Sequence, residues 1–294
     1  PNAPPSPPSI DLLQLNERAL AKLRGSQIAM IFQEPMTSLN PVFTIGDQIF
    51  EAITLHSPGI TTSRARTIAM DALERVGITN PAARLRMYPH EFSGGMRQRA
   101  MIAMALACNP RILLADEPTT ALDVTVQAQV LDLIGSLQRE RGMSVMLITH
   151  DLRIVKDRAD VICAMYAGRV VEYGPAQKIL SSPLHPYTKA LLMCTPRLET
   201  RGHNLPTVAD LLHGPKSMLT SIEHPTDLCK VQAQAWWPHH PAPPGTPPLD
   251  PVSLFEARPG RWISLWNTPQ LPLDGRTHPD VHHSASVASP VTLV

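Results

Sequence analysis

The stretch from Phe92 to Asp123 places the strongest limits on what this 294-residue chain can fold into. It opens with Ser93-Gly94-Gly95, where a good helix N-cap is followed by glycines that let backbone N–H groups approach a ligand. The start of a helix carries roughly half a positive charge, which suits a phosphate group. The opening of this stretch therefore predicts a helix start that can bind phosphate.

A short apolar run follows at Ile112–Ala115, of the kind that forms a buried parallel strand. It ends in Asp116-Glu117, at the sheet edge where α/β proteins usually bind ligands. One carboxylate can hold Mg²⁺ and the other can orient an attacking water. Each piece has an ordinary alternative, because Ser-Gly-Gly is more often a plain turn and Asp-Glu-Pro a solvated strand end. The order of the pieces along the chain is what is informative.

This ordered set resembles the ABC-type ATPases. Residues 92–96 match the signature motif of that family, residues 112–117 its Walker B strand, and Ala121-Leu122-Asp123 its D-loop. The signature reads Phe-Ser-Gly-Gly-Met where the family commonly has Leu-Ser-Gly-Gly-Gln, but its serine and both glycines are intact. The resemblance implies an α/β fold, a partial P-loop-NTPase-like nucleotide-binding domain with a helical subdomain.

Gln33 and His150 match further motifs of the same family. Gln33 follows a predicted strand at Ile28–Phe32 and matches the Q-loop glutamine, which in the family reaches Mg²⁺ and the attacking water. His150 follows a predicted strand at Met143–Thr149 and resembles the switch histidine that contacts the γ-phosphate. Taken alone, a glutamine or a histidine at a strand end is more often structural.

Two segments narrow the resemblance to the oligopeptide and dipeptide importers. Residues 33–42 read Gln-Glu-Pro-Met-Thr-Ser-Leu-Asn-Pro-Val, and residues 185–192 read His-Pro-Tyr-Thr-Lys-Ala-Leu-Leu. We assign no catalytic role to residues 185–192. The imported solute is left open among dipeptides, longer peptides, glutathione-like thiols and nickel, all of which relatives carry.

For the chain's own ATP site, the resemblance implies catalytic roles for Glu117, His150 and Gln33. Glu117 would orient or deprotonate water, and His150 would stabilise the leaving phosphate. Asp116 would hold Mg²⁺, with Gln33 as a further ligand. The cofactors expected are therefore ATP and Mg²⁺.

The resemblance also implies a head-to-tail dimer with a second ABC ATPase subunit. Ser93, Gly94 and Gly95 would contact the γ-phosphate of an ATP that the partner holds, and Asp123 would link the two sites. Transmembrane permease subunits complete the expected assembly, an extracytoplasmic solute-binding protein acts on it indirectly, and no nucleic acid is involved. The chain is then expected to be peripheral, at the cytoplasmic face of the inner (plasma) membrane.

One motif of the family is missing from the sequence. No Gly-x-x-x-x-Gly-Lys-Ser/Thr loop precedes Gln33, and the segment 214–217 has neither the earlier glycine nor the right position. We therefore expect a fragment or a truncated product that begins after the P-loop. Such a chain is expected to be inactive alone, because the P-loop supplies most of the contacts that bind ATP before hydrolysis.

Periodicity and composition predict the remaining organisation. Helices are expected over residues 11–24, 45–56, 61–76, 94–107, 125–141, 152–159 and 175–180, and a hairpin over residues 161–173. Residues 1–24 form a proline-rich start with a short helix, and residues 25–200 form the ABC ATPase domain fragment, with its helical subdomain at about 44–95. Residues 201–294 are a proline-rich C-terminal extension or linker, predicted to be irregular and poorly ordered. A tandem second cassette opening at residues 249–266 has no glycine-rich loop to support it.

Composition weighs against several classes of protein. A formal net charge of +1 gives no argument for a nucleic-acid or anionic-membrane partner. No apolar run reaches 18 residues, so no membrane-spanning helix is predicted, and the first nine residues do not read as a signal peptide. The four cysteines are far apart, which indicates reduced thiols in place of a zinc site or a disulfide framework.

The leading hypothesis is the ATP-hydrolysing subunit of an ABC importer for peptides or related small solutes, here without its Walker A loop. The alternative is a catalytically inactive partner that lends its signature half-site to a complete subunit. A third hypothesis is a soluble ABC ATPase of nucleic-acid metabolism. The net charge and the peptide-importer segments argue against that third class.

Overall fold

The computed structural model describes residues 10–33, 38–120, 122–166, 169–195, 207–208, 254–258, 260–264 and 291–293. The chain divides into two compact units, Pro7–Ile148 and the chain from Thr149 onward, which we call the N-terminal and C-terminal units. The proline-rich start predicted for the first nine residues lies outside the described ranges.

Parallel strands form the centre of the N-terminal unit, with β2 between β1 and β3. These strands are β1 (Ile28–Ile31), β2 (Ile112–Asp116) and β3 (Ser144–Ile148). Leu113 and Ala115 are fully buried, as expected for a parallel strand that is covered on both faces. In the register, Ile31 lies opposite Ala115 and Asp116 opposite Ile148, so the carboxyl ends of the strands share one edge.

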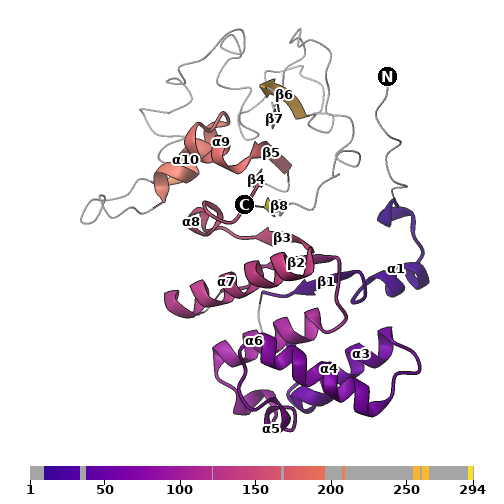
Figure 1. Cartoon of the computed structure of the whole chain (residues 1–294). Coiled ribbons are helices and arrows are strands. Elements are labelled where there is room, and N and C mark those ends of the chain that lie inside the picture. The colour runs from indigo at the N-terminus through magenta and orange to yellow at the C-terminus, as the bar shows by residue number, and fades with distance from the viewer. Residues whose placement is uncertain are drawn as a thin grey trace. The chain divides into compact units, whose positions relative to one another are not determined.

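The helices of this unit follow the predicted order. They are η1 (Leu12–Gln14), α1 (Glu17–Leu23), α3 (Ile45–His56), α4 (Thr62–Arg75), α5 (Pro81–Arg84), η2 (Pro89–Glu91), α6 (Gly94–Leu106) and α7 (Val124–Arg141). Helices α3 to α6 pack on one another as a helical group (Figure 1). Helix α6 also contacts β1, so the helix that begins at the glycine pair reaches the sheet.

Capping side chains decide where several of these helices begin. Thr44 Oγ1 accepts the Asp47 N–H (3.1 Å) and Asp47 accepts the Thr44 N–H (3.2 Å), a reciprocal capping box that starts α3. Asn16 accepts the Ala19 N–H at 2.9 Å and is the N-cap of α1, which begins after η1 has ended. The prediction of one continuous helix over residues 11–24 is therefore wrong, because a second N-cap interrupts it.

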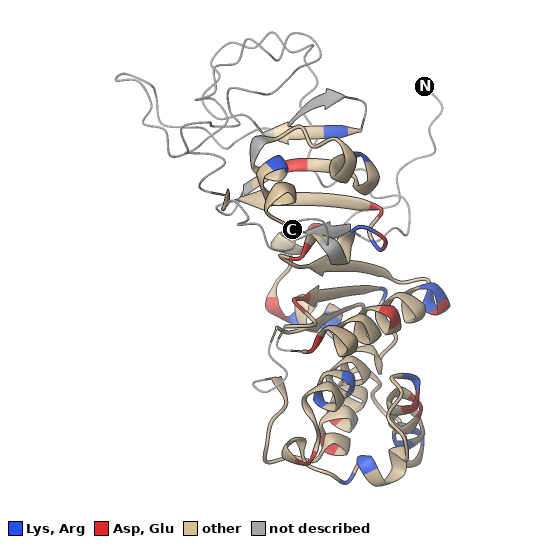
Figure 2. Cartoon of the chain, turned by 90° about the vertical axis from the view of Figure 1, so that its left-hand side faces the viewer, with Lys and Arg blue, Asp and Glu red and all other residues tan. Residues whose placement is uncertain are grey.

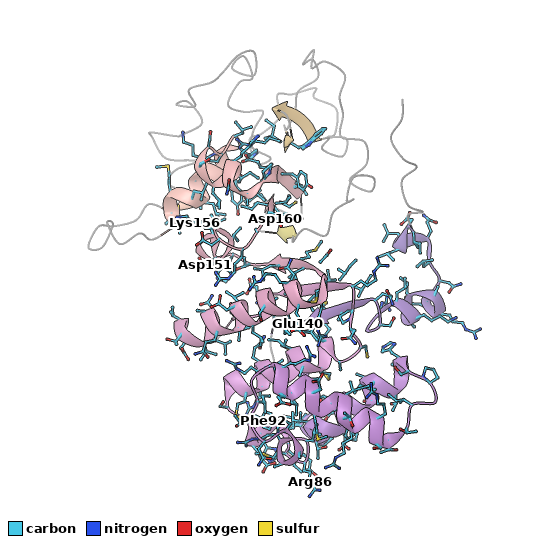
Figure 3. All side chains as sticks on the ribbon, viewed as in Figure 1. Arg86, Phe92, Glu140, Asp151, Lys156 and Asp160 are labelled. Carbon is cyan, nitrogen blue, oxygen red and sulfur yellow. The ribbon has the colours of Figure 1, made fainter. Side chains whose placement is uncertain are left out.

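Arginine side chains join the helical group to α7. Arg75 of α4 pairs with Asp71 (2.9 Å) and with Glu140 of α7, which Figure 3 labels. Arg99 of α6 donates to the Val76 carbonyl (2.7 Å) and to Gln129 of α7 (3.0 Å). Basic and acidic residues are interspersed along these helices (Figure 2), and partly exposed pairs such as Arg75–Glu140 contribute only about 0–1 kcal/mol.

The C-terminal unit contains the predicted hairpin, whose turn at Ala167-Gly168 lies outside the described residues. Strands β4 and β5 are antiparallel, β5 pairs with β7, β7 pairs with β6, and β8 runs parallel to β4. The strands are β4 (Val161–Tyr166), β5 (Arg169–Pro175), β6 (Leu254–Arg258), β7 (Arg261–Ser264) and β8 (Val291–Leu293). The helices are α8 (Leu152–Val155), α9 (Ala176–Ser181) and α10 (Pro186–Cys194), so α8 is shorter than the predicted 152–159.

A buried ion pair connects β7 with β5. Arg261 Nη2 lies 2.6 Å from Glu172 Oε1, and the two side chains are 3% and 0% exposed. Glu172 also accepts the backbone N–H groups of Leu184 and His185, each at 3.0 Å. Part of the segment predicted to be irregular thus forms a hairpin, while most of residues 201–294 lies outside the described residues.

Two further observations concern the helices and the thiol groups of the described residues. In the part of the chain that the structure describes, no helix combines the length and the apolar character that crossing a bilayer requires. Cys108 and Cys163 are free thiols, and burial raises the pKa of Cys163 to about 11.

Candidate functional site

The chain turns sharply where β2 ends. Glu117 has a φ of +42°, in the left-handed region that costs a non-glycine residue roughly 1–2 kcal/mol. Its N–H donates to the Ile148 carbonyl of β3 (3.0 Å), and its carbonyl accepts the Thr120 N–H (3.1 Å). The second bond closes a four-residue turn with Pro118 at its second position, where proline is favoured. Strained backbone of this kind is typical of functional positions.

The carboxylate of Glu117 accepts hydrogen bonds from two segments of the chain. Gln33 Nε2 donates to Glu117 Oε2 at 2.8 Å, and Thr120 Oγ1 donates to the same oxygen at 2.8 Å. Gln33 follows β1 and Glu117 follows β2, so the parallel pairing of these strands brings the two side chains together. The structure thus joins two residues, 84 positions apart, that the sequence predicts for one site.

Asp116 and Gln33 offer oxygens that suit Mg²⁺. Asp116 is the last residue of β2 and is partly exposed, and Gln33 is exposed. Mg²⁺ prefers oxygen ligands and at nucleotide sites is held by one or two carboxylates together with phosphate oxygens. Among the described residues, no group of three or more His, Cys, Asp and Glu side chains converges on a metal site. The donor set therefore fits a Mg²⁺ ion that arrives with a nucleotide better than a protein-only metal site.

The helix start at Ser93 has the predicted geometry. Ser93 is the N-cap of α6, and its hydroxyl accepts the Met96 N–H at 3.4 Å. A Cβ atom built on Gly95 would lie 3.1 Å from Val126 Cγ1, whereas one built on Gly94 would meet no atom of the described residues within 4 Å. Packing within the chain explains a small residue at position 95, but it does not explain one at position 94. The open space beside Gly94 leaves room for a ligand or a partner at the first turn.

The segment before Ser93 is fixed from α6. Arg97 donates to the carbonyls of Pro89 (Nε, 2.7 Å) and His90 (Nη2, 3.4 Å). Phe92, labelled in Figure 3, is 2% exposed in the helical group. These contacts hold the approach to the helix start in place.

Gln98 connects α6 with the turn that carries Glu117. Its side chain is 1% exposed, and Nε2 lies 2.5 Å from the Pro118 carbonyl oxygen. The sequence motifs assign no role to Gln98 or to Thr120. A signal for Gln98 exists, because it shares a helical stripe with the buried Met101 and Ile102 at spacings of three and four residues.

Asp123 and His150 belong to different units of the chain. Asp123 is exposed and caps α7, with Oδ1 accepting the N–H groups of Thr125 (3.1 Å) and Val126 (3.0 Å). His150 is exposed and belongs to the C-terminal unit. The roles predicted for these two residues remain predictions.

Sequence comparisons point to one family. Residues 8–120 match the family described as ABC transporter, and residues 171–220 match the oligopeptide/dipeptide transporter C-terminal region. A putative peptide import ATP-binding protein of Brucella melitensis is 51% identical over 212 residues, which cover 70% of this chain and 62% of that protein. The dipeptide transport ATP-binding protein DppD of Escherichia coli is 48% identical over 231 residues, which cover 76% of this chain and 70% of that protein.

A structural comparison gives the fold. The dimeric structure of an ATP-binding cassette in a post-hydrolysis state, bound to ADP and Pi, matches with a TM-score of 0.50 and 29% sequence identity. The match covers 55% of this chain and 68% of that chain. The predicted α/β fold is therefore confirmed. The chain spans about three-fifths of the length of its Brucella relative.

Proposed function

Because this chain belongs to the ABC transporter family, among the ATP-binding proteins of oligopeptide and dipeptide import, we propose that it is the ATP-hydrolysing subunit of an importer. The expected cargo is peptides or related small solutes, since the Brucella relative is named for peptide import and the Escherichia coli relative for dipeptide transport. The observation that carries the proposal is the 2.8 Å contact between Gln33 and Glu117 at the carboxyl ends of neighbouring parallel strands.

In this mechanism Glu117 accepts a proton or a hydrogen bond from the water that attacks the γ-phosphate. Gln33 holds the Glu117 carboxylate and reaches toward the same water. Asp116 and Gln33 would hold Mg²⁺, which when bound offsets the negative charge of the phosphates. His150 would stabilise the phosphate that leaves.

The signature half-site serves a second subunit in the proposed assembly. Ser93 and the glycines after it present backbone N–H groups at a helix start, and the space beside Gly94 is open for a phosphate held by the partner. Asp123 would link this half-site to the chain's own site. The dimeric cassette among the similar structures supports a pair of such subunits, for which we propose the head-to-tail arrangement. Permease subunits would hold the pair peripherally at the cytoplasmic face of the inner membrane.

The test is Glu117→Gln in the full-length protein. The substitution keeps the size of the side chain but removes the base, so we expect ATP turnover to fall about 10²- to 10⁴-fold while ATP still binds. Glu51→Gln, on the exposed side of α3, is the matched control and should keep normal turnover. Turnover that is unchanged in Glu117→Gln would remove Glu117 from this role.

A second candidate function is the inactive partner that lends its signature half-site to a complete subunit. The open space beside Gly94 favours it equally, because that half-site acts on a partner's ATP. ATP hydrolysis is measured for this chain alone and after mixing with a complete homologous ATP-binding domain. ATP hydrolysis by the chain alone would exclude the inactive-partner function. That function would be favoured if the chain hydrolyses no ATP itself but stimulates hydrolysis by the complete domain.

A further inference from the structure

We propose that Thr120 is a positioning residue for hydrolysis, which fixes the carboxylate of Glu117 through its hydroxyl group. The proposal rests on the function proposed above, in which Glu117 directs the attacking water. It adds a residue that acts on the reaction only through Glu117.

Thr120 makes two bonds back to the same residue. Its N–H donates to the Glu117 carbonyl (3.1 Å), and its Oγ1 donates to Glu117 Oε2 (2.8 Å). Pro118 lies between them and restricts the turn, while Gln98 holds the Pro118 carbonyl from α6. The backbone bond sets the turn, and the hydroxyl bond reaches the functional end of the side chain.

Local bonds from threonine hydroxyls are common and usually stabilise a turn by accepting from or donating to the backbone. The Thr120 hydroxyl instead donates to a side-chain carboxylate. The backbone turn is already closed by the hydrogen bond from the Thr120 N–H to the Glu117 carbonyl. A second donor, Gln33, comes from another strand end and meets the same oxygen. Donors from two directions on Oε2 restrict rotation of the carboxylate, as positioning of a reacting group requires.

The first arm of the test is turnover of the full-length protein with Thr120→Val, which keeps the shape of the side chain and removes the hydroxyl. We expect kcat to fall about tenfold, in the range for one lost hydrogen bond to a charged group, with KM for ATP changed less than about twofold. Thr120→Ser restores the hydroxyl and should recover most of the loss. Thr67→Val, on the exposed side of α4, is the matched control.

A double variant separates positioning from general damage. If Thr120 acts through Glu117, adding Thr120→Val to Glu117→Gln should produce little further loss. A full additional tenfold loss would overturn the proposal. Normal turnover of Glu117→Gln would instead refute the proposed function, so the two failures are distinguishable.

The second arm needs no turnover and uses this chain. The Gln33 side-chain amide is followed by NMR relaxation, because its mobility reports whether the Glu117 carboxylate is held. In Thr120→Val the order parameter of this amide should fall below its wild-type value, while Thr67→Val leaves it unchanged. An amide that is equally rigid in Thr120→Val overturns the proposal.

Discussion

At the scale of single residues, His185 makes the stability of the chain depend on pH. Its imidazole is fully buried, and desolvation lowers its pKa from 6.5 to about 3. Nδ1 accepts the Tyr187 N–H at 3.1 Å, which the neutral ring can do. Between pH 6.5 and 3 the unfolded chain binds more protons than the folded one. We therefore expect stability to fall as the pH is lowered through this window, by roughly 1.4 kcal/mol per unit once well below 6.5.

Urea unfolding at pH 7.5, 6.5 and 5.5 measures this effect. His185→Asn removes the titrating ring and keeps an N-cap that can accept the Tyr187 N–H, so its stability should depend less on pH than that of the wild type. His90→Asn, at an exposed position, should follow the wild-type curve. Equal pH dependence of the His185→Asn variant and the wild type would contradict the assignment to His185.

At the scale of elements, a hydrogen bond from Gln98 connects α6 with the turn after β2. Gln98→Met keeps the length of the side chain but leaves the buried Pro118 carbonyl without this donor. We expect the free energy of unfolding to fall by about 1–3 kcal/mol, measured by urea denaturation. Gln14→Met, at an exposed position of η1 in the same unit, should change it by less than about 0.5 kcal/mol. A loss no larger than that of the control would show that the contact with Pro118 contributes nothing to stability.

The buried pair between β5 and β7 is a second link between elements. Arg261→Met leaves the buried Glu172 carboxylate without its cation, and we expect a loss of about 3–5 kcal/mol in denaturant unfolding. Adding Glu172→Gln removes the buried charge and leaves an oxygen for the Leu184 and His185 N–H groups, so the double variant should be more stable than Arg261→Met alone. A double variant that is less stable would show that the cost arises from packing.

The elements also show how far the sequence predicts the structure. The helix predicted at residues 45–56 is found as Ile45–His56, because its cap and its apolar stripe are both local signals. The β6–β7 hairpin was not predicted, because it depends on partners far along the chain, such as Glu172 for Arg261, 89 residues apart. For the site, the resemblance to the ABC-type ATPases predicted that Gln33 and Glu117 serve one site. The contacts of Thr120 and Gln98 depend on the turn after β2, which only the folded chain defines.

At the scale of the whole molecule, the proposed assembly with a second subunit would depend on a residue that the chain's own fold does not need. Gly94 begins α6 and has no positive φ, and within the described part of the chain no atom lies within 4 Å of an added Cβ. Gly94→Ala should therefore fold normally and keep or slightly raise the thermal stability, since alanine favours a helix more than glycine does. In the proposed assembly, the added methyl group would occupy the space through which a partner's phosphate would approach the helix start.

We expect Gly94→Ala to weaken, by roughly tenfold or more, the effect of the chain on ATP turnover by a complete homologous ATP-binding domain. Gly135→Ala is the matched control, because it also adds a methyl group to a helix, in α7, where the nearest atom, Arg139 Nη1, is 3.6 Å away. Thermal unfolding of both variants verifies that each is folded. If Gly94→Ala stimulates the complete domain as well as Gly135→Ala does, no phosphate approaches this turn, and the signature half-site has lost its proposed role.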